Sequence, residues 1–119
     1  MRSTVIVYHR THHAEAIERR GFRDDHYVMP GIGELRGIFV SALWPPDKEE
    51  SGDGDILFEL EIPEALFVEH EHVEYGKSCR SALIPAALLN QHRGTLHRLS
   101  RNEETRLSVE RWGLVRRDL

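Results

Sequence analysis

The chain has 119 residues, a net charge of −4, and 39% hydrophobic and 30% charged residues. This composition is typical of a folded globular protein and excludes a disordered or fibrous chain; the length predicts a single domain over residues 1–119. No apolar run approaches the roughly 20 residues that span a bilayer, and the N-terminal segment lacks the apolar core of a secretory signal. The single cysteine, Cys79, excludes an internal disulfide. We therefore expect a cytoplasmic protein with no membrane partner.

The charges are arranged in blocks along the chain. Residues 47–77 hold eleven acidic side chains and two lysines, whereas residues 78–119 hold eight arginines and four acids. The acidic block has two interpretations, a solvated surface or the docking face of a protein partner. Fourteen of the sixteen basic residues are arginines, which favours planar, bidentate contacts to phosphate or carboxylate.

The first third of the chain predicts two strands joined through a helix and a loop. β-branched and aromatic residues over 3–9 predict a buried strand. The apolar spacing over 14–20 predicts a short helix that ends at Gly21. One proline and two glycines predict a loop over 23–36, and residues 37–42 predict the second strand.

Residues 55–62 contain the clearest strand signal, because apolar residues alternate with a mostly acidic set. The residues that follow predict short elements, which favours an α+β fold of small, mostly antiparallel sheets with short helices. These elements are a helical turn from Pro63, an irregular segment or weak edge strand over 70–77, a strand over 81–84, a helical turn over 85–90, and a helix with a capping box at Ser100–Glu103 that ends at Gly113.

Eight histidines require metal binding to be considered. His9, His12 and His13 form one cluster in the sequence; His70 and His72 would share one face of a strand, as two metal ligands require. The sequence contains neither HExxH nor CxxC. The second pair also fits a solvated position beside neighbouring glutamates, so a small histidine-ligated metal protein is one alternative.

The segment Tyr8-His9-Arg10-Thr11 ends the predicted first strand and leads directly into the predicted helix. Imidazole, guanidinium and hydroxyl groups together can bind a ribose hydroxyl and a phosphate, and the start of a helix favours an anion. The structural alternative is that His9 satisfies a backbone group at the strand end while Arg10 is solvated. From these residues alone, both interpretations stay open.

Three segments in order, VYHRT, the helix ending RRGF, and RGIFVSALWP, resemble the ADP-ribosyltransferase superfamily. That superfamily includes poly(ADP-ribose) polymerases, diphtheria-type toxins and tRNA 2′-phosphotransferases. The chain is also similar to a group of small bacterial proteins in which YHRT, GVW-S and VPAALLN recur, matched here by residues 8–11, 37–41 and 84–90. The resemblance covers about residues 4–90, and the order and spacing of short motifs carry it.

The resemblance implies an ADP-ribosyltransferase-like fold that binds NAD and transfers ADP-ribose. By position, His9 and Thr11 would hold the ribose on the nicotinamide side, and Ser41 would support that pocket. Such transferases usually carry a catalytic glutamate on a later strand, but residues 76–84 contain no acid. Glu74 is the nearest candidate for this catalytic role.

A site with arginines and a histidine but no glutamate resembles instead the RNA 2′-phosphotransferase branch of the superfamily. In this version Arg10, Arg36 and Arg80 would neutralise phosphate charge, Arg80 with a catalytic role. The ligand is then a nucleotide or NAD, and the acceptor a protein or an RNA. A further alternative from another class is a non-catalytic interaction module, of toxin–antitoxin or phage-related type, whose acidic 47–77 segment docks a basic partner.

Overall fold

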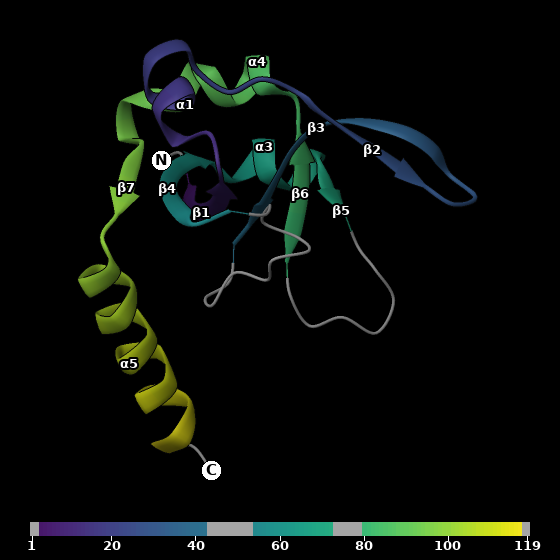
Figure 1. Ribbon diagram of the computed structural model, residues 1–119. Helices are drawn as coiled ribbons and strands as arrows, with labels where there is room; N and C mark the ends of the chain where they lie inside the picture. The colour runs from purple at the N-terminus through teal and green to yellow at the C-terminus, as the bar shows by residue number, and fades with distance from the viewer. Residues whose placement is uncertain (1–2, 43–53, 73–79, 118–119) are drawn as a thin grey trace.

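The first strand lies inside a seven-stranded sheet of order β5-β6-β3-β1-β4-β7, with β2 paired to β3 (Figure 1). This is seen in a computed structural model that describes residues 3–42, 54–72 and 80–117. Every strand pairing in these ranges is antiparallel, which confirms the expected α+β class. The elements are β1 (Thr4–Thr11), α1 (Ala14–Arg20), β2 (Asp25–Met29), β3 (Gly33–Ser41), β4 (Ile56–Pro63), α3 (Glu64–Glu69), β5 (Glu71–His72), β6 (Ser81–Ile84), α4 (Ala86–Leu89), a 3₁₀ helix η1 (Asn90–Thr95), β7 (His97–Leu99) and α5 (Arg101–Arg117).

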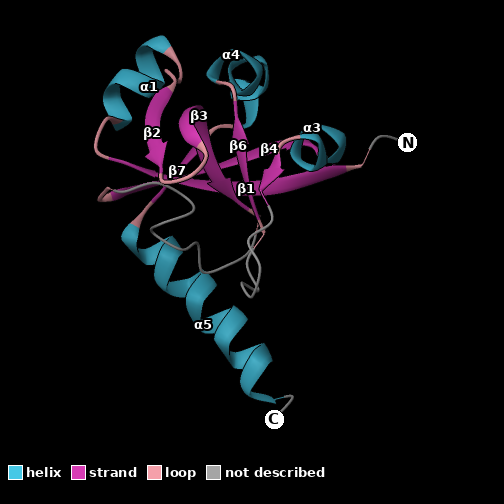
Figure 2. Cartoon of the chain, turned by 90° about the vertical axis from the view of Figure 1, so that its right-hand side faces the viewer, coloured by secondary structure: helices cyan, strands magenta, loops and turns pink. Residues whose placement is uncertain are grey.

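The two faces of the sheet pack against different helices (Figure 2). One face, here called the helix-covered face, lies beneath α1, α3 and α4. The opposite face, here called the α5 face, has a smaller apolar cluster in which Leu107 of α5 packs on Tyr8, Leu57 and Leu99. Side chains alternate between the two faces along a strand, so residues two positions apart in one strand lie on the same face. The main core of the helix-covered face includes Val7, Ile38, Val40, Phe58, Leu60, Ile62, Ala82 and Ile84.

The prediction of a loop over residues 23–36 is wrong, because most of these residues form a β-hairpin. β2 pairs with the first half of β3 from Asp25↔Gly37 to Met29↔Gly33. The proline and glycines mark the turn alone, where Gly31 and Gly33 have φ of 82° and 106°. The hairpin extends away from the sheet (Figure 1), and Val28 near its tip is 83% exposed. Because both of its faces meet solvent there, its strands lack the apolar alternation that predicts a strand.

The helix expected near the C-terminus begins as predicted but does not end as predicted. The Ser100 hydroxyl accepts a hydrogen bond from the Glu103 N–H, and the Glu103 carboxylate accepts one from the Ser100 N–H, both at 3.1 Å. This reciprocal pair confirms the capping box. The helix continues through Gly113 to Arg117, because a single glycine costs an interior helix position only about 1 kcal/mol.

The start of α5 is expected to be most stable in mildly acidic solution. The Glu103 carboxylate contacts His97 Nε2 at 2.8 Å; this contact raises the pKa of His97 and, with the Ser100 hydrogen bonds, lowers the pKa of Glu103 to about 2. The Glu103 contribution is complete above its unfolded pKa of about 4.3 and is lost as the pH falls toward 2. The His97 contribution is present below about pH 6.5 and is lost as the pH rises through the raised pKa.

The measurement is an NMR titration of the His97 ring protons in the wild type and in Glu103→Gln. We expect the midpoint to fall toward the ordinary histidine value in Glu103→Gln, while Glu110→Gln leaves it unchanged. Equal midpoints in all three proteins would contradict the assignment. The glutamine retains a capping group at this position, so loss of the helix does not confound the comparison.

The RRGF and IPAALLN motifs contact each other in the folded chain. The Asn90 amide pairs with the backbone of Phe22: its Oδ1 accepts from the Phe22 N–H at 2.7 Å and its Nδ2 donates to the Phe22 carbonyl at 3.0 Å. Asp24 accepts a hydrogen bond from the Ala86 N–H at 2.7 Å. Gly21 has φ of 92°, and a Cβ there would lie 2.7 Å from Asn90 Oδ1. These residues therefore join the segment after α1 to both ends of α4.

Candidate functional site

Of the seven residues expected to form the site, the six that the structure describes do not gather around one point. On β1, His9 and Thr11 lie two and four residues after Val7 and therefore face the helix-covered side. Arg10 lies two residues after Tyr8 and is therefore on the α5 face. Ser41 pairs with Tyr8 in register, so it also lies on the α5 face. The structure thus brings Arg10 and Ser41 to one face and separates both from His9 and Thr11.

His9 lies at a seam in the sheet. In the described parts of β1 and β3 the backbone register includes one pair, Tyr8↔Ser41, whereas β1 and β4 pair over eight positions. Beyond Tyr8 the His9 ring spans the gap: its Nδ1 lies 2.8 Å from the Phe39 carbonyl. A carbonyl can only accept, so Nδ1 carries the proton and donates.

Burial holds His9 and Thr11 in structural contacts. His9 is 6% exposed, and its ring meets the edge of Phe22 at 5.9 Å between centroids. Thr11 is 4% exposed and its hydroxyl accepts a hydrogen bond from the His13 N–H at 2.9 Å. The His9 contact matches the structural interpretation, in which this side chain satisfies a backbone group at the strand end. The other half of that interpretation is wrong, because Arg10 is not solvated but pairs with Glu104.

Three hydroxyl-bearing residues form a cross-strand row on the α5 face. Tyr8 on β1 pairs with Ser41 on β3, and Ser41 pairs with Ser81 on β6. Tyr8 is 4% exposed, Ser41 is fully buried and Ser81 is 2% exposed. The Cβ atoms of residues paired directly across two strands are usually about 5 Å apart. We call these three residues the hydroxyl row; two of them, Tyr8 and Ser41, belong to the resembling motifs.

Two further polar residues extend the row on the β4 side. Glu59 pairs with Tyr8, and His97 pairs with Glu59. The carboxylate of Glu59 also helps to raise the pKa of His97. The row therefore ends in a carboxylate and an imidazole on the same face of the sheet.

Arg10 lies two residues beyond Tyr8 on this face and contacts α5. Its Nη2 donates to the Glu104 carboxylate at 3.2 Å, and its side chain is 21% exposed. The Arg10 Nε is buried and has no hydrogen-bond partner in the part of the chain that the structure describes. An unsatisfied buried donor costs about 1–3 kcal/mol.

Arg80 lies on the helix-covered side, away from Arg10. It pairs with Glu71 through two hydrogen bonds, from Nε at 3.1 Å and from Nη2 at 3.0 Å, and its guanidinium lies 5.1 Å from the ring centroid of Phe67. The contact raises the pKa of Arg80 and lowers that of Glu71. A phosphate would have to displace this bidentate carboxylate to reach Arg80.

The other two expected site residues lie elsewhere. Arg36 is on the hairpin, 65% exposed, with Glu34 at 3.9 Å. Glu74 lies outside the described residues, as do Cys79 and much of the acidic block. Within the described part of that block, Asp55 contacts His12 at 2.7 Å and Glu61 accepts a hydrogen bond from Thr4 at 2.6 Å. Several of its acids are therefore already paired within the chain.

Sequence reasoning missed Tyr8, Ser81, Glu59 and Glu104. Alternation along the first strand could have placed Tyr8 and Arg10 together, opposite His9. The partner strands carried no such signal, because register depends on tertiary pairing. In the described parts of the chain no group of three or more His, Cys, Asp or Glu side chains is placed to hold a metal ion.

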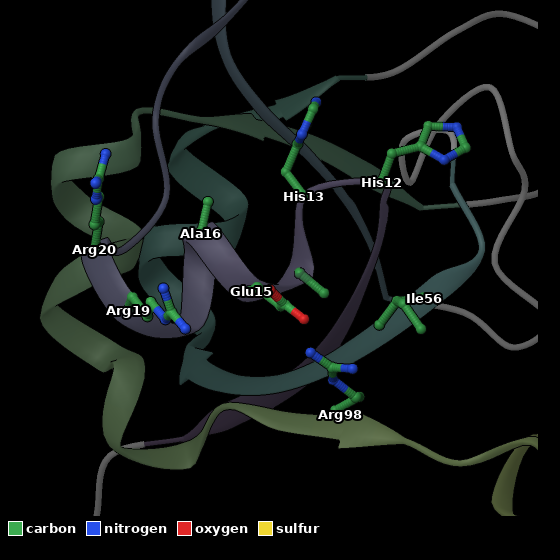
Figure 3. Close-up of a pocket in the computed structure, with 9 residues that line it drawn as sticks. His12, His13, Glu15, Ala16, Arg19, Arg20, Ile56 and Arg98 are labelled. Carbon is green, nitrogen blue, oxygen red and sulfur yellow. The ribbon is translucent and has the colours of Figure 1, made fainter.

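A concavity of about 540 Å³ opens beside the start of α1, on the helix-covered side of the sheet (Figure 3). None of the six expected site residues within the described ranges lines it. Two of its basic side chains already have acidic partners, since Arg98 pairs with Glu18 and His12 with Asp55. Figure 3 shows the His12, His13 and Arg20 side chains pointing in different directions rather than to one centre. The lining residues are His12, His13, Ala14, Glu15, Ala16, Arg19, Arg20, Ile56 and Arg98.

Comparison with known proteins assigns no family. No protein-family model, curated protein or solved structure matches the chain. Among the helices that the structure describes, none is long and apolar enough to cross a membrane.

Proposed function

We propose that the chain binds a nucleotide, with NAD as the leading ligand, on the α5 face of its sheet, as an ADP-ribosyltransferase-like protein. The observation that supports this proposal is the position of Arg10 beside the hydroxyl row of Tyr8, Ser41 and Ser81. The row is buried in this conformation, so a ligand reaches it only when the residues that cover this face move. Hydroxyl groups both donate and accept, which suits ribose hydroxyls and a carboxamide. A guanidinium next to them suits a phosphate.

Calorimetric titration with NAD tests the proposal, using wild-type protein, Ser41→Ala and Arg10→Met. We expect Ser41→Ala to weaken binding about 2- to 10-fold, the loss of one neutral hydrogen bond. Arg10→Met should weaken it about 10- to 100-fold, because a charged hydrogen bond is lost.

Ser3→Ala, at an exposed position outside the row, is the matched control and should bind like the wild type. Circular dichroism of each variant checks that the fold is retained. Absence of heat with millimolar NAD and folded wild-type protein would reject NAD binding. Equal affinity in wild type and Ser41→Ala would remove the hydroxyl row from the site.

Two carboxylates are candidates for the catalytic role if ADP-ribose is transferred. Such a group stabilises the positive charge that develops on the ribose as nicotinamide leaves. Glu74 is the candidate from the resemblance, and Glu59 is the carboxylate in register with Tyr8. Nicotinamide release from NAD should be compared in Glu74→Gln and Glu59→Gln; the catalytic one lowers turnover by orders of magnitude while NAD affinity changes little.

The RNA 2′-phosphotransferase version depends on Arg80 being available to phosphate. Its bidentate pair with Glu71 favours the NAD version instead. If this version holds, Arg80→Ala abolishes transfer of a 2′-phosphate. An inactive wild type would reject it.

A second candidate function is a non-catalytic interaction module. The exposed apolar residues of the β2–β3 hairpin favour it, with Val28 83% and Ile32 64% exposed. Co-purification from the native host should then be lost on Val28→Lys, and on charge reversal within residues 47–77 if the acidic segment takes part. A partner retained in both variants would reject this candidate.

A further inference from the structure

Only one of the two nitrogens on the Nε–Nη2 edge of the Arg10 guanidinium has a hydrogen-bond partner in the described parts of the chain. The guanidinium makes one hydrogen bond, from Nη2 to Glu104, while its buried Nε has no partner in the described parts of the chain. Arg80 shows the complete arrangement in the same molecule, with Nε and Nη2 both donating to Glu71. The Arg10 group therefore presents the side-on edge that recognises two oxygens of one anion, with that edge incompletely filled.

A phosphate group fits this edge. Two of its oxygens can accept from Nε and Nη2 at once, and a charge-assisted bidentate contact is stronger than the single contact to Glu104. Arg10 also neighbours the hydroxyl row, so a phosphate held here would leave the sugar next to it within reach of Tyr8 and Ser41. Glu104 occupies the position that a phosphate oxygen would take.

Helix α5 contacts the Arg10 guanidinium at this edge. Apart from the contact of Glu103 with His97 on β7, its described side-chain contacts with the sheet are made by Glu104, to Arg10, and by Leu107, to Tyr8, Leu57 and Leu99. These two residues lie one turn apart on the same side of the helix. The rest of α5 extends away from the sheet (Figures 1 and 2). A shift of this one turn would break the contact between Arg10 and Glu104 and release Nη2.

We propose that Arg10 is a phosphate-binding residue whose site is closed in this conformation by Glu104, so that docking of α5 and binding of a phosphate-bearing ligand compete. The inference rests on the proposed nucleotide-binding function, and it adds an autoinhibitory contact to that function. Glu104 acts as an internal anion in place of the ligand.

The test follows the Nε–H resonance of Arg10 by ¹H–¹⁵N NMR during titration with inorganic pyrophosphate, assigned by its loss in Arg10→Met. We expect the resonance to move on titration. In Glu104→Gln the competing charge is gone and pyrophosphate should bind on the order of tenfold more tightly, the effect of one charged hydrogen bond. Leu107→Ala, which loosens the same turn, should also tighten binding.

Matched controls separate this site from general anion binding. Glu110→Gln removes an exposed acid from the same helix and should leave the affinity unchanged. The Arg93 Nε is also buried without a partner in the described residues, but its Nη2 donates to the carbonyls of Ile17 and Glu18, so its resonance should not move. Equal effects of Glu104→Gln and Glu110→Gln would overturn the competition.

Two further titrations identify the kind of ligand that carries the phosphate and distinguish failure of this inference from failure of the proposed function. NAD and an RNA oligonucleotide ending in a 2′-phosphate replace pyrophosphate in turn. If calorimetry detects NAD binding but the Arg10 Nε–H resonance does not shift, NAD binding stands and this inference is overturned. If pyrophosphate moves Arg10 but NAD gives no heat, the phosphate site stands and NAD binding fails. An Arg10 resonance that is unmoved in both wild type and Glu104→Gln overturns the inference outright.

Discussion

Replacing Phe67 with alanine is expected to lower the free energy of unfolding by about 3–5 kcal/mol, as for other fully buried phenylalanines. Phe67 is 0% exposed in the main core. Its ring also supports the Arg80 guanidinium at 5.1 Å, so the substitution removes a cation–π contact as well as apolar contacts. A cavity at this position would loosen the Arg80–Glu71 pair, which joins β5 to the start of β6.

Urea unfolding followed by circular dichroism measures this effect. Val68→Ala is the matched control, because Val68 is the next residue on α3 and is 53% exposed. The control should change stability by less than about 0.5 kcal/mol, as exposed positions generally do. A Phe67→Ala protein as stable as Val68→Ala would mean that α3 does not pack on the sheet as described.

Replacing Asn90 with alanine is expected to cost about 2–4 kcal/mol. The side chain makes two hydrogen bonds to the backbone N–H and carbonyl of Phe22, at 2.7 and 3.0 Å. Alanine leaves both groups of a buried residue unsatisfied, at about 1–3 kcal/mol for each such group. Water that enters the space reduces the total.

The same unfolding measurement tests Asn90, with two comparison variants. Asn90→Asp retains the acceptor for the Phe22 N–H but loses the donor, so its stability should be intermediate. Gln91→Ala, at the exposed neighbouring position, should be close to wild type. An Asn90→Ala effect equal to that of Gln91→Ala would show that the contact between the RRGF and IPAALLN motifs contributes nothing to stability.

Elements with one buried face were predictable from the sequence. The strand expected over 55–62 was found because apolar alternation reports burial on one side. The capping box at Ser100 was found because its signal is entirely local. The β2–β3 hairpin was missed because its exposed strands lack that alternation, and its turn residues made the whole segment resemble a loop.

The candidate site was less predictable than the fold. His9, Arg10 and Thr11 are consecutive in the sequence, but the alternation of a strand sends Arg10 to the opposite face from its neighbours. The partners of the two arginines, Glu104 and Glu71, are brought in by the packing of α5 and by the β5–β6 pairing. No local pattern in the sequence specifies either contact. The ADP-ribosyltransferase-like assignment itself stays a prediction from the motif order.

The seam between β1 and β3 has a consequence for the native-state fluctuations of the chain. On one side, β1, β4 and β7 are joined by an eight-position ladder and a shorter one; on the other, β3 is held by β2 and β6. Separating the two halves breaks one register pair and the His9 contact rather than a full ladder, and it opens the main core that both halves share. Amides beside the seam are therefore expected to exchange with solvent through a partial opening that leaves each half folded, at a lower free energy than global unfolding.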